Sequence, residues 1–133
     1  VPLAMVLCDT IIIDKRTEKK SLIGTFSNIY TKKFPFRANH FSIYLSLTDG
    51  HGQYEGSLVC SDSENNEIFR AKGNIAFPGG AKTVVEMVYD IGGLVFPEEG
   101  VYNFSLYCGD TIVISRECRV SLVPEDEEAS EEE

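Results

Sequence analysis

The residues best suited to chemistry in this chain are the pair Cys8-Asp9 and two histidines, His40 and His51. Catalysis needs a nucleophile or an acid–base pair held in a pocket, with a third group that orients the base. His51 stands between two glycines at a predicted turn, and His40 begins a predicted strand, so both are expected in ordinary surface positions. Neither belongs to a recognised catalytic motif. The sequence therefore predicts a protein that is not an enzyme, with a distant catalytic partner as the alternative.

Asp9 is the most suggestive polar residue. It has the same parity as Leu7 and Ile11, which predicts that its carboxylate points inward. A buried carboxylate must be paired or must shift its pKa, because an isolated buried charge is costly. Two interpretations stay open: a reactive or ion-binding site, or a structural carboxylate that accepts backbone hydrogen bonds or pairs with Arg116 or Arg119. The structural interpretation is favoured.

The cysteines show no spacing typical of a zinc site or a redox pair. Most of them end strand-like apolar runs, such as Leu58-Val59-Cys60. The N-terminal stretch has no secretory signal pattern, and buried reduced thiols are typical of cytosolic proteins. We expect a cytoplasmic protein with four reduced cysteines, which are Cys8, Cys60, Cys108 and Cys118.

An acidic stretch with two asparagines, Asp62 to Glu67, offers oxygen atoms that superficially resemble calcium ligands. The twelve-residue spacing of an EF-hand is absent, and calcium needs six to eight oxygens in a shaped loop. Gly92-Gly93 lacks the further glycine and the helix that bind phosphate. We interpret the acidic stretch as the tip of a hairpin, and we predict no metal and no cofactor.

Strands must position all of these residues, because apolar and polar residues alternate with a period of two along most of the chain. Turn-forming residues interrupt this alternation at the regular spacing of a small all-β domain. The sequence predicts about eight strands in an antiparallel β-sandwich of residues 1–123, with a closed barrel as the alternative. The clearest alternation is in residues 41–48, where the residues predicted to face the core are Phe41, Ile43, Leu45 and Leu47.

Two local features predict connections between strands. Gly50 and Gly52 can supply the positive φ angles of a tight turn, which predicts a hairpin between residues 41–48 and 53–60. Arg116 interrupts the apolar parity of the last strand, which predicts a bulge or a change of sheet near it.

The most recognisable segment is residues 96–106, Phe-Pro-Glu-Glu-Gly-Val-Tyr-Asn-Phe-Ser-Leu. It resembles the part of immunoglobulin-like sandwiches where a Pro/Gly corner precedes a strand bearing a tyrosine, whose hydroxyl bonds to nearby backbone. The chain has no tryptophan, and Cys108 does not follow Tyr102 by two residues, so two features of antibody domains are missing. The resemblance implies an immunoglobulin-like sandwich of another type.

A narrower resemblance lies in the N-terminal half. Leu7-Cys8-Asp9, Ile13-Asp14 and Ser21-Leu22-Ile23-Gly24-Thr25-Phe26 are followed by the Phe-Pro-x-x-Gly-x-Tyr-x-Phe corner. This order of motifs is similar to that of an uncharacterised bacterial family of small β proteins, over roughly residues 4–122. The resemblance implies a bacterial cytoplasmic β-sandwich and assigns no catalytic or binding residue.

Charge is distributed unevenly along the chain, whose net charge is −9. Residues 125–133 contain seven acidic residues and no basic one, and we expect residues 124–133 to be a disordered acidic tail. Such a tail beside a nearly neutral body disfavours nucleic-acid binding. No apolar run reaches membrane-spanning length, so we expect no membrane partner.

Two groups of residues are candidates for contact with a protein partner. The first is basic and includes Lys15, Arg16, Lys19 and Lys20, with Lys32, Lys33 and Arg37 further on. It is either a solvated turn or a contact patch for an acidic surface, including the acidic tail of a second copy. The second group is Phe34 and Phe36, which lie in a connection and either plug the open end of a sandwich or form an exposed patch.

The function predicted from the sequence is that of a non-enzymatic interaction or structural accessory protein, with a protein partner or self-association. The alternative is a sandwich that binds a small molecule or a carbohydrate, since sugar sites display aromatic rings beside polar groups. The rings available for such a site are Tyr30, Tyr44, Tyr54 and Tyr107.

Overall fold

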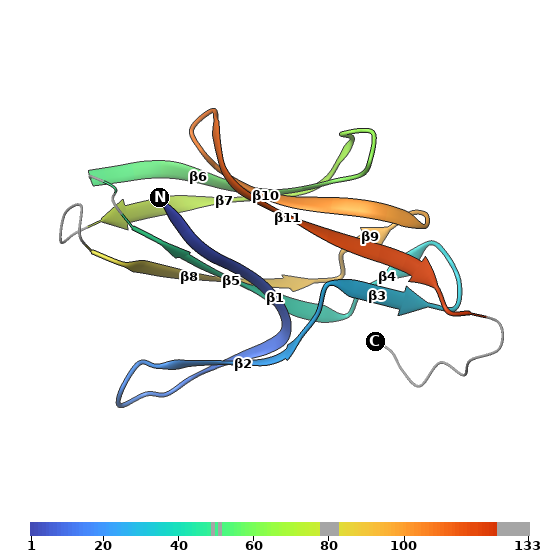
Figure 1. The fold of residues 1–133 in the computed structure, drawn as a ribbon, viewed down its shortest axis with the longest axis horizontal. Coiled ribbons are helices and arrows are strands. Elements are labelled where there is room, and N and C mark those ends of the chain that lie inside the picture. The colour runs from blue at the N-terminus through green and yellow to red at the C-terminus, as the bar shows by residue number, and fades with distance from the viewer. Residues whose placement is uncertain (49, 51, 78–82, 125–133) are drawn as a thin grey trace.

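The computed structural model describes residues 1–48, 50, 52–77 and 83–124, and every regular element among them is a strand (Figure 1). The prediction of an all-β protein is therefore confirmed for these residues. The described residues form eleven strands rather than about eight, because three short ones of two to four residues were not predicted as separate strands. The strands are β1 (Pro2–Ile13), β2 (Lys20–Thr25), β3 (Asn28–Thr31), β4 (Phe36–Arg37), β5 (His40–Leu47), β6 (Gly52–Ser61), β7 (Glu67–Phe77), β8 (Val85–Gly92), β9 (Val95–Phe96), β10 (Gly100–Cys108) and β11 (Thr111–Leu122).

The strands form two main sheets. The first has the order β2-β1-β5-β8, the second has the order β3-β11-β10-β6-β7, and β4 pairs with β9 in a small ribbon. All pairs are antiparallel except β3 and β11, which run parallel. Figure 1 shows the two main sheets as two layers, with β6, β7, β10 and β11 above β1, β5 and β8.

A single buried cluster lies between the layers and takes side chains from both. Leu7, Ile43 and Leu45 come from the first sheet and are fully buried, as are Leu58 and Leu106 from the second. Phe41 on β5 meets Phe104 on β10 edge-to-face, with their ring centroids 5.8 Å apart. Each such side chain contributes about 1.5–3 kcal/mol by burial, so this shared core holds the two sheets together.

The predicted hairpin between residues 41–48 and 53–60 is wrong. The two strands lie in different sheets, because β5 pairs with β1 and β8 whereas β6 pairs with β7 and β10. Gly50 is buried against the Phe77 ring, where a Cβ would overlap the aromatic carbons. Gly50 therefore packs against the core, between a strand of one layer and a strand of the other. Residues 49 and 51 of this connection, including His51, lie outside the described residues.

The alternation in β5 is confirmed on one face only. Phe41, Ile43 and their odd-numbered neighbours are buried as predicted, but Ser42 is fully buried too and Ser46 is 6% exposed. β5 lies in the interior of its sheet, with β1 and β8 on either side, so small serine side chains are covered by larger neighbours. Ser42 Oγ donates a hydrogen bond to Asp90 Oδ1 at 2.7 Å, which satisfies the buried hydroxyl.

The irregularity predicted near Arg116 lies earlier in β11. Leu106 on β10 is opposite Ile114, but Tyr107 is opposite Ile112, which leaves Val113 as an extra residue. A bulge of this kind reverses the side-chain parity, and Ile112 is consequently 51% exposed. The Arg116 guanidinium lies at an edge of the two layers. It donates hydrogen bonds to Met5 O at 2.9 Å and to Ser27 Oγ at 2.8 Å. Arg116 thus tethers β11 to β1, and the bulge is a separate feature.

The segment between β9 and β10 is held by a tyrosine. Tyr102 is 1% exposed, and its Oη donates to Glu98 O at 2.5 Å. Its ring meets that of the fully buried Phe96 edge-to-face, at 4.9 Å between centroids. The hydroxyl therefore fastens the loop four residues upstream onto the start of β10.

Candidate functional site

A cavity of about 490 Å³ lies where the chain passes from β2 in the first sheet to β3 in the second. Its lining divides into buried or half-buried apolar residues, which form the floor, and exposed residues, polar except for one glycine, which form the rim. The floor consists of Phe26, Ile29, Phe36, Ala38 and Phe41. The rim consists of Asp9, Gly24, Thr25, Asn28, Tyr30, Asn39 and His40.

The Asp9 carboxylate lies at this rim, so the prediction that it is buried is wrong. Its parity matches that of the buried Leu7, but Asp9 is exposed because this face of β1 opens into the cavity beyond the core. Gly24 makes room for it, since Gly24 has a φ of 72° and a Cβ there would overlap the carboxylate. Neither Arg116, whose guanidinium donates elsewhere, nor any other described residue forms an ion pair with Asp9.

His40 also lies at the rim, on β5 beside β1, and its side chain is half-exposed. Its Nε2 is 3.8 Å from Asp90 Oδ1, the same oxygen that accepts the Ser42 hydroxyl. The carboxylate thus lies between the imidazole and the hydroxyl. In a nucleophilic triad the imidazole would contact the hydroxyl directly, and that contact is not made among the described residues.

The cysteines are free thiols with little nucleophilic character. Burial raises the pKa of Cys60 and of Cys118 to about 12. Burial, followed by the charges of Asp9 and Asp90, also raises the pKa of Cys8. The thiolate is the reactive form of cysteine, and a raised pKa keeps these thiols protonated at neutral pH. They therefore pack as small apolar groups.

The residues of the acidic stretch form hydrogen bonds and an ion pair within and beside their own turn. Asp62 Oδ1 accepts hydrogen bonds from the backbone N–H groups of Glu64 and Asn66, at 2.9 and 2.8 Å. These bonds, that of Asn66 first, lower the pKa of Asp62. Glu67 forms a two-pronged ion pair with Arg70, at 2.9 and 3.0 Å. The geometry is that of a hairpin tip between β6 and β7, and no cluster suited to a metal ion occurs among the described residues.

The second notable feature is a hairpin arm, residues 10–23, formed by the end of β1 and most of β2. β1 pairs with β5 only up to Cys8, whereas residues 10–13 pair with β2 alone. The arm therefore leaves the two-layer body. Figure 1 shows it bending away below β5 and β8.

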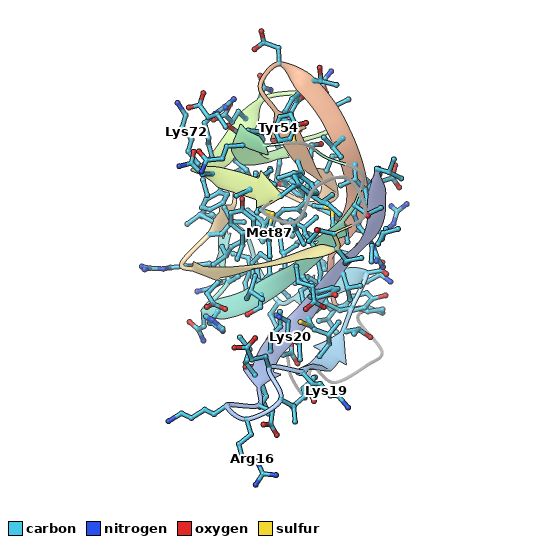
Figure 2. All side chains as sticks on the ribbon, turned by 90° about the vertical axis from the view of Figure 1, so that its left-hand side faces the viewer. Arg16, Lys19, Lys20, Tyr54, Lys72 and Met87 are labelled. Carbon is cyan, nitrogen blue, oxygen red and sulfur yellow. The ribbon has the colours of Figure 1, made fainter. Side chains whose placement is uncertain are left out.

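The predicted basic contact residues divide into two groups on this arm. Lys15, Arg16 and Lys19 are exposed at the tip, and Figure 2 shows Arg16 and Lys19 pointing away from the body. Lys20 instead lies between the arm and the sheet, where its Nζ is 2.8 Å from Glu86 Oε1 on β8. Its side chain is only 17% exposed, so Lys20 anchors the arm rather than offering a free charge.

Tyr44 completes this anchor, because its hydroxyl donates to the other oxygen of Glu86. Lys20 first and Tyr44 second lower the pKa of Glu86, since both hydrogen bonds favour the ionised carboxylate. Burial and the bond to Glu86 raise the pKa of Tyr44. The arm is thus anchored by a carboxylate of the same sheet, on β8, with β1 and β5 between it and β2 in the strand order.

The predicted aromatic contact residues pack inward. Phe34 and Phe36 are half-buried and lie against the core, and the Phe36 ring stacks on that of Phe96 at 6.4 Å. The geometry matches the interpretation of a plug at the open end of the layers. Phe36 also forms part of the cavity floor.

Several residues of both sites were missed by the sequence analysis. Asn28 and Asn39 line the cavity rim, and Glu86 holds the arm. No local pattern identifies them, because Lys20 and Glu86 are 66 positions apart in the chain. Of the four tyrosines considered for a sugar site, Tyr30 alone lines the cavity.

Taken together, the described residues define a small all-β protein of two facing sheets, with a polar-rimmed cavity and a projecting arm. The chain belongs to the Family of unknown function (DUF6941), which it matches over residues 3–121. The expected membership of a family without an assigned activity is thereby confirmed. A search among curated proteins found none that matches the chain. Within the described ranges, no helix has the length and apolar character to cross a membrane.

Proposed function

We propose that this protein is an immunoglobulin-like β-sandwich of the bacterial cytoplasm that works by binding rather than by catalysis. The connectivity supports the fold, because β1, β5 and β8 share one sheet while β6, β7, β10 and β11 share the other, as in immunoglobulin-like domains with an added strand. The bond from Tyr102 to Glu98 O has the form of a tyrosine corner. The inert thiols and the separated His40 and Ser42 support a non-enzymatic role.

The observation that carries the binding proposal is the outward face of the arm. Ile12 and Ile23 are 52% and 46% exposed, and the register that places Thr10 opposite Ile23 puts them on the same face as diagonal neighbours. Ile13, which pairs with Lys20, is 51% exposed but lies on the opposite face of the arm, so the outward apolar pair consists of Ile12 and Ile23. Isolated exposed apolar residues are common, but adjacent ones beside a basic tip are typical of a contact surface.

The charge of the arm indicates the kind of partner. Residues 10–23 contain four basic and two acidic residues, although the whole chain has a net charge of −9. Lys20 forms an ion pair with Glu86, and the Asp14 carboxylate accepts hydrogen bonds from backbone N–H groups of the turn. Lys15, Arg16 and Lys19 therefore present positive charge beside apolar side chains. The partner that fits is a protein surface with an apolar centre and an acidic edge.

Comparative capture from the native host tests this proposal. The wild-type protein, the double variants I12S/I23S and K15E/R16E, and the controls I112S and K72E are immobilised and exposed to the same lysate. Ile112 is as exposed as Ile12, and Figure 2 shows Lys72 at the opposite end of the molecule from the arm.

We expect a protein that is retained by the wild type and both controls and is lost from both arm variants. Equal retention by all five proteins would contradict a role for the arm. Unchanged thermal melting of the variants shows that the loss does not come from unfolding.

A second function, binding of a small molecule, is favoured by the cavity. Its volume lies within the range of ligand pockets, about 300–1,000 Å³, and it combines an apolar floor with a few polar groups. The arm and the cavity are formed by different residues, so the two functions can be tested separately.

A further inference from the structure

The cavity floor offers flat apolar surfaces. Phe26 and Phe41 meet edge-to-face with centroids 5.9 Å apart, and the half-buried Phe36, whose ring stacks on Phe96, also lines the floor. Tyr30 stands at the rim and is 50% exposed, so its ring is open to a ligand. Aromatic rings of this kind pack against the C–H faces of ring-shaped ligands while a phenol hydroxyl stays available for hydrogen bonding.

The rim is made of groups that both donate and accept hydrogen bonds. Asn28 and Asn39 each carry an amide, Tyr30 and Thr25 carry hydroxyls, and His40 carries an imidazole. The side chains of Asn28, Tyr30 and Asn39 make no hydrogen bond with another described residue, so their polar atoms face solvent. Hydroxyl groups are their natural counterparts, because a hydroxyl also donates and accepts.

Charge narrows the ligand class further. Asp9 is the one acidic residue of the lining, and no lysine or arginine belongs to it among the described residues. A phosphate or carboxylate ligand would meet a negative charge with no cation to bind it. Metal binding is disfavoured, since no group of three suitable ligands occurs in the described part of the chain.

We infer that this cavity binds a neutral polyhydroxylated ring, a mono- or disaccharide, with Asp9 accepting hydrogen bonds from two adjacent hydroxyls. The inference rests on the second function proposed above and names its ligand class. Gly24 holds open the place of the Asp9 carboxylate, and His40, whose Nε2 is 3.8 Å from Asp90 Oδ1, lies at the same rim. The sugar ring lies over Phe36 and Tyr30, and Asn28 and Asn39 bond to the hydroxyls at its edge.

Titration followed by amide NMR tests the inference on the full chain. The probes are glucose, galactose, mannose and maltose, with glucose 6-phosphate and putrescine as an anionic and a cationic comparison. We expect at least one neutral sugar to shift amides of residues 24–30 and 38–41, with a dissociation constant of roughly 1 mM. D9N should weaken this binding by about ten-fold or more, because it removes a charged acceptor and keeps the side-chain shape.

The matched control is D110N, which changes an exposed aspartate in the turn between β10 and β11 and should leave sugar binding unchanged. Absence of binding by every neutral sugar would overturn the inference. It would also be overturned by tighter binding of glucose 6-phosphate than of glucose, by binding of putrescine alone, or by equal effects of D9N and D110N. The arm variant K15E/R16E should bind sugar normally, so failure here is distinguishable from failure of the arm as a contact surface.

Discussion

Removal of the anchor between the arm and the sheet should release the arm without unfolding the body. The perturbation is K20M, which keeps most of the aliphatic stem of Lys20 but removes its ammonium group from Glu86. Tyr44 still donates to Glu86 in this variant, but its bond does not involve the arm. The arm then has no ion pair to the body among the described residues.

The magnitude follows from the exposure of the two partners. Lys20 is 17% exposed and Glu86 is 39% exposed at the side chain, so the pair lies near the surface and is partly screened. Pairs of this kind contribute about 0.5–1 kcal/mol. Since 1.4 kcal/mol corresponds to a factor of ten, amide exchange in the arm should accelerate about two- to five-fold in K20M.

The pH dependence has a definite sign. The pKa of Glu86 is lowered in the folded protein from the ordinary value of 4.5. Its contribution is therefore complete above pH 4.5 and is lost as the pH falls through the lower folded value. The difference between wild type and K20M should be full at pH 7 and should disappear once Glu86 is protonated.

Hydrogen exchange measured by NMR, residue by residue, is the assay. We expect faster exchange at residues 10–23 and unchanged exchange in β6 and β10, which lie in the other sheet. The control R70M breaks the ion pair with Glu67 on β7, far from the arm, and should leave arm exchange unchanged. Unchanged arm exchange in K20M, or equal acceleration throughout the molecule, would refute the anchoring role of Glu86.

Three further predictions concern the body. Y102F should lower the free energy of unfolding by about 1 kcal/mol in urea titrations, since it removes the hydroxyl that binds Glu98 O and keeps the ring; no change would contradict the corner. Because the pKa values of Cys60 and Cys118 rise from 9.0 to about 12 on folding, stability should fall as the pH rises above 9, and C118A should flatten this slope in pH-dependent melts. F36A should lower stability by about 2 kcal/mol in thermal melts, as expected of a half-buried plug, whereas loss of partner capture with unchanged melting would identify an interface instead.

The strands could be predicted from the sequence because alternation is a local signal. Phe41 and Ile43 are two residues apart and both face the core, as their alternation with polar residues predicts. Tyr102 forms a hydrogen bond with backbone only four residues away. The pairing of strands is not local. The turn at Gly50 has the composition of a hairpin, yet the strands before and after it lie in different sheets, and Gly50 packs against Phe77.

The candidate sites were less accessible to prediction for the same reason. The basic turn was predicted to be either a solvated turn or a contact patch, but the sequence does not show that Lys20 is held by a carboxylate from another strand. Asp9 has the parity of a core residue, and its exposure depends on where the core ends. The cavity rim draws on segments from β1 to β5, so Asn28 and Asn39 acquire a role only once the chain is folded.

The measurement that bears most directly on the proposed function is site-specific photo-crosslinking in the native host. A photoreactive residue replaces Ile12 on the arm in one variant and the equally exposed Ile112 on β11 in another. Binding through the arm predicts a discrete crosslinked protein adduct at position 12 and none at position 112. The same adducts at both positions, or none at position 12, would contradict it.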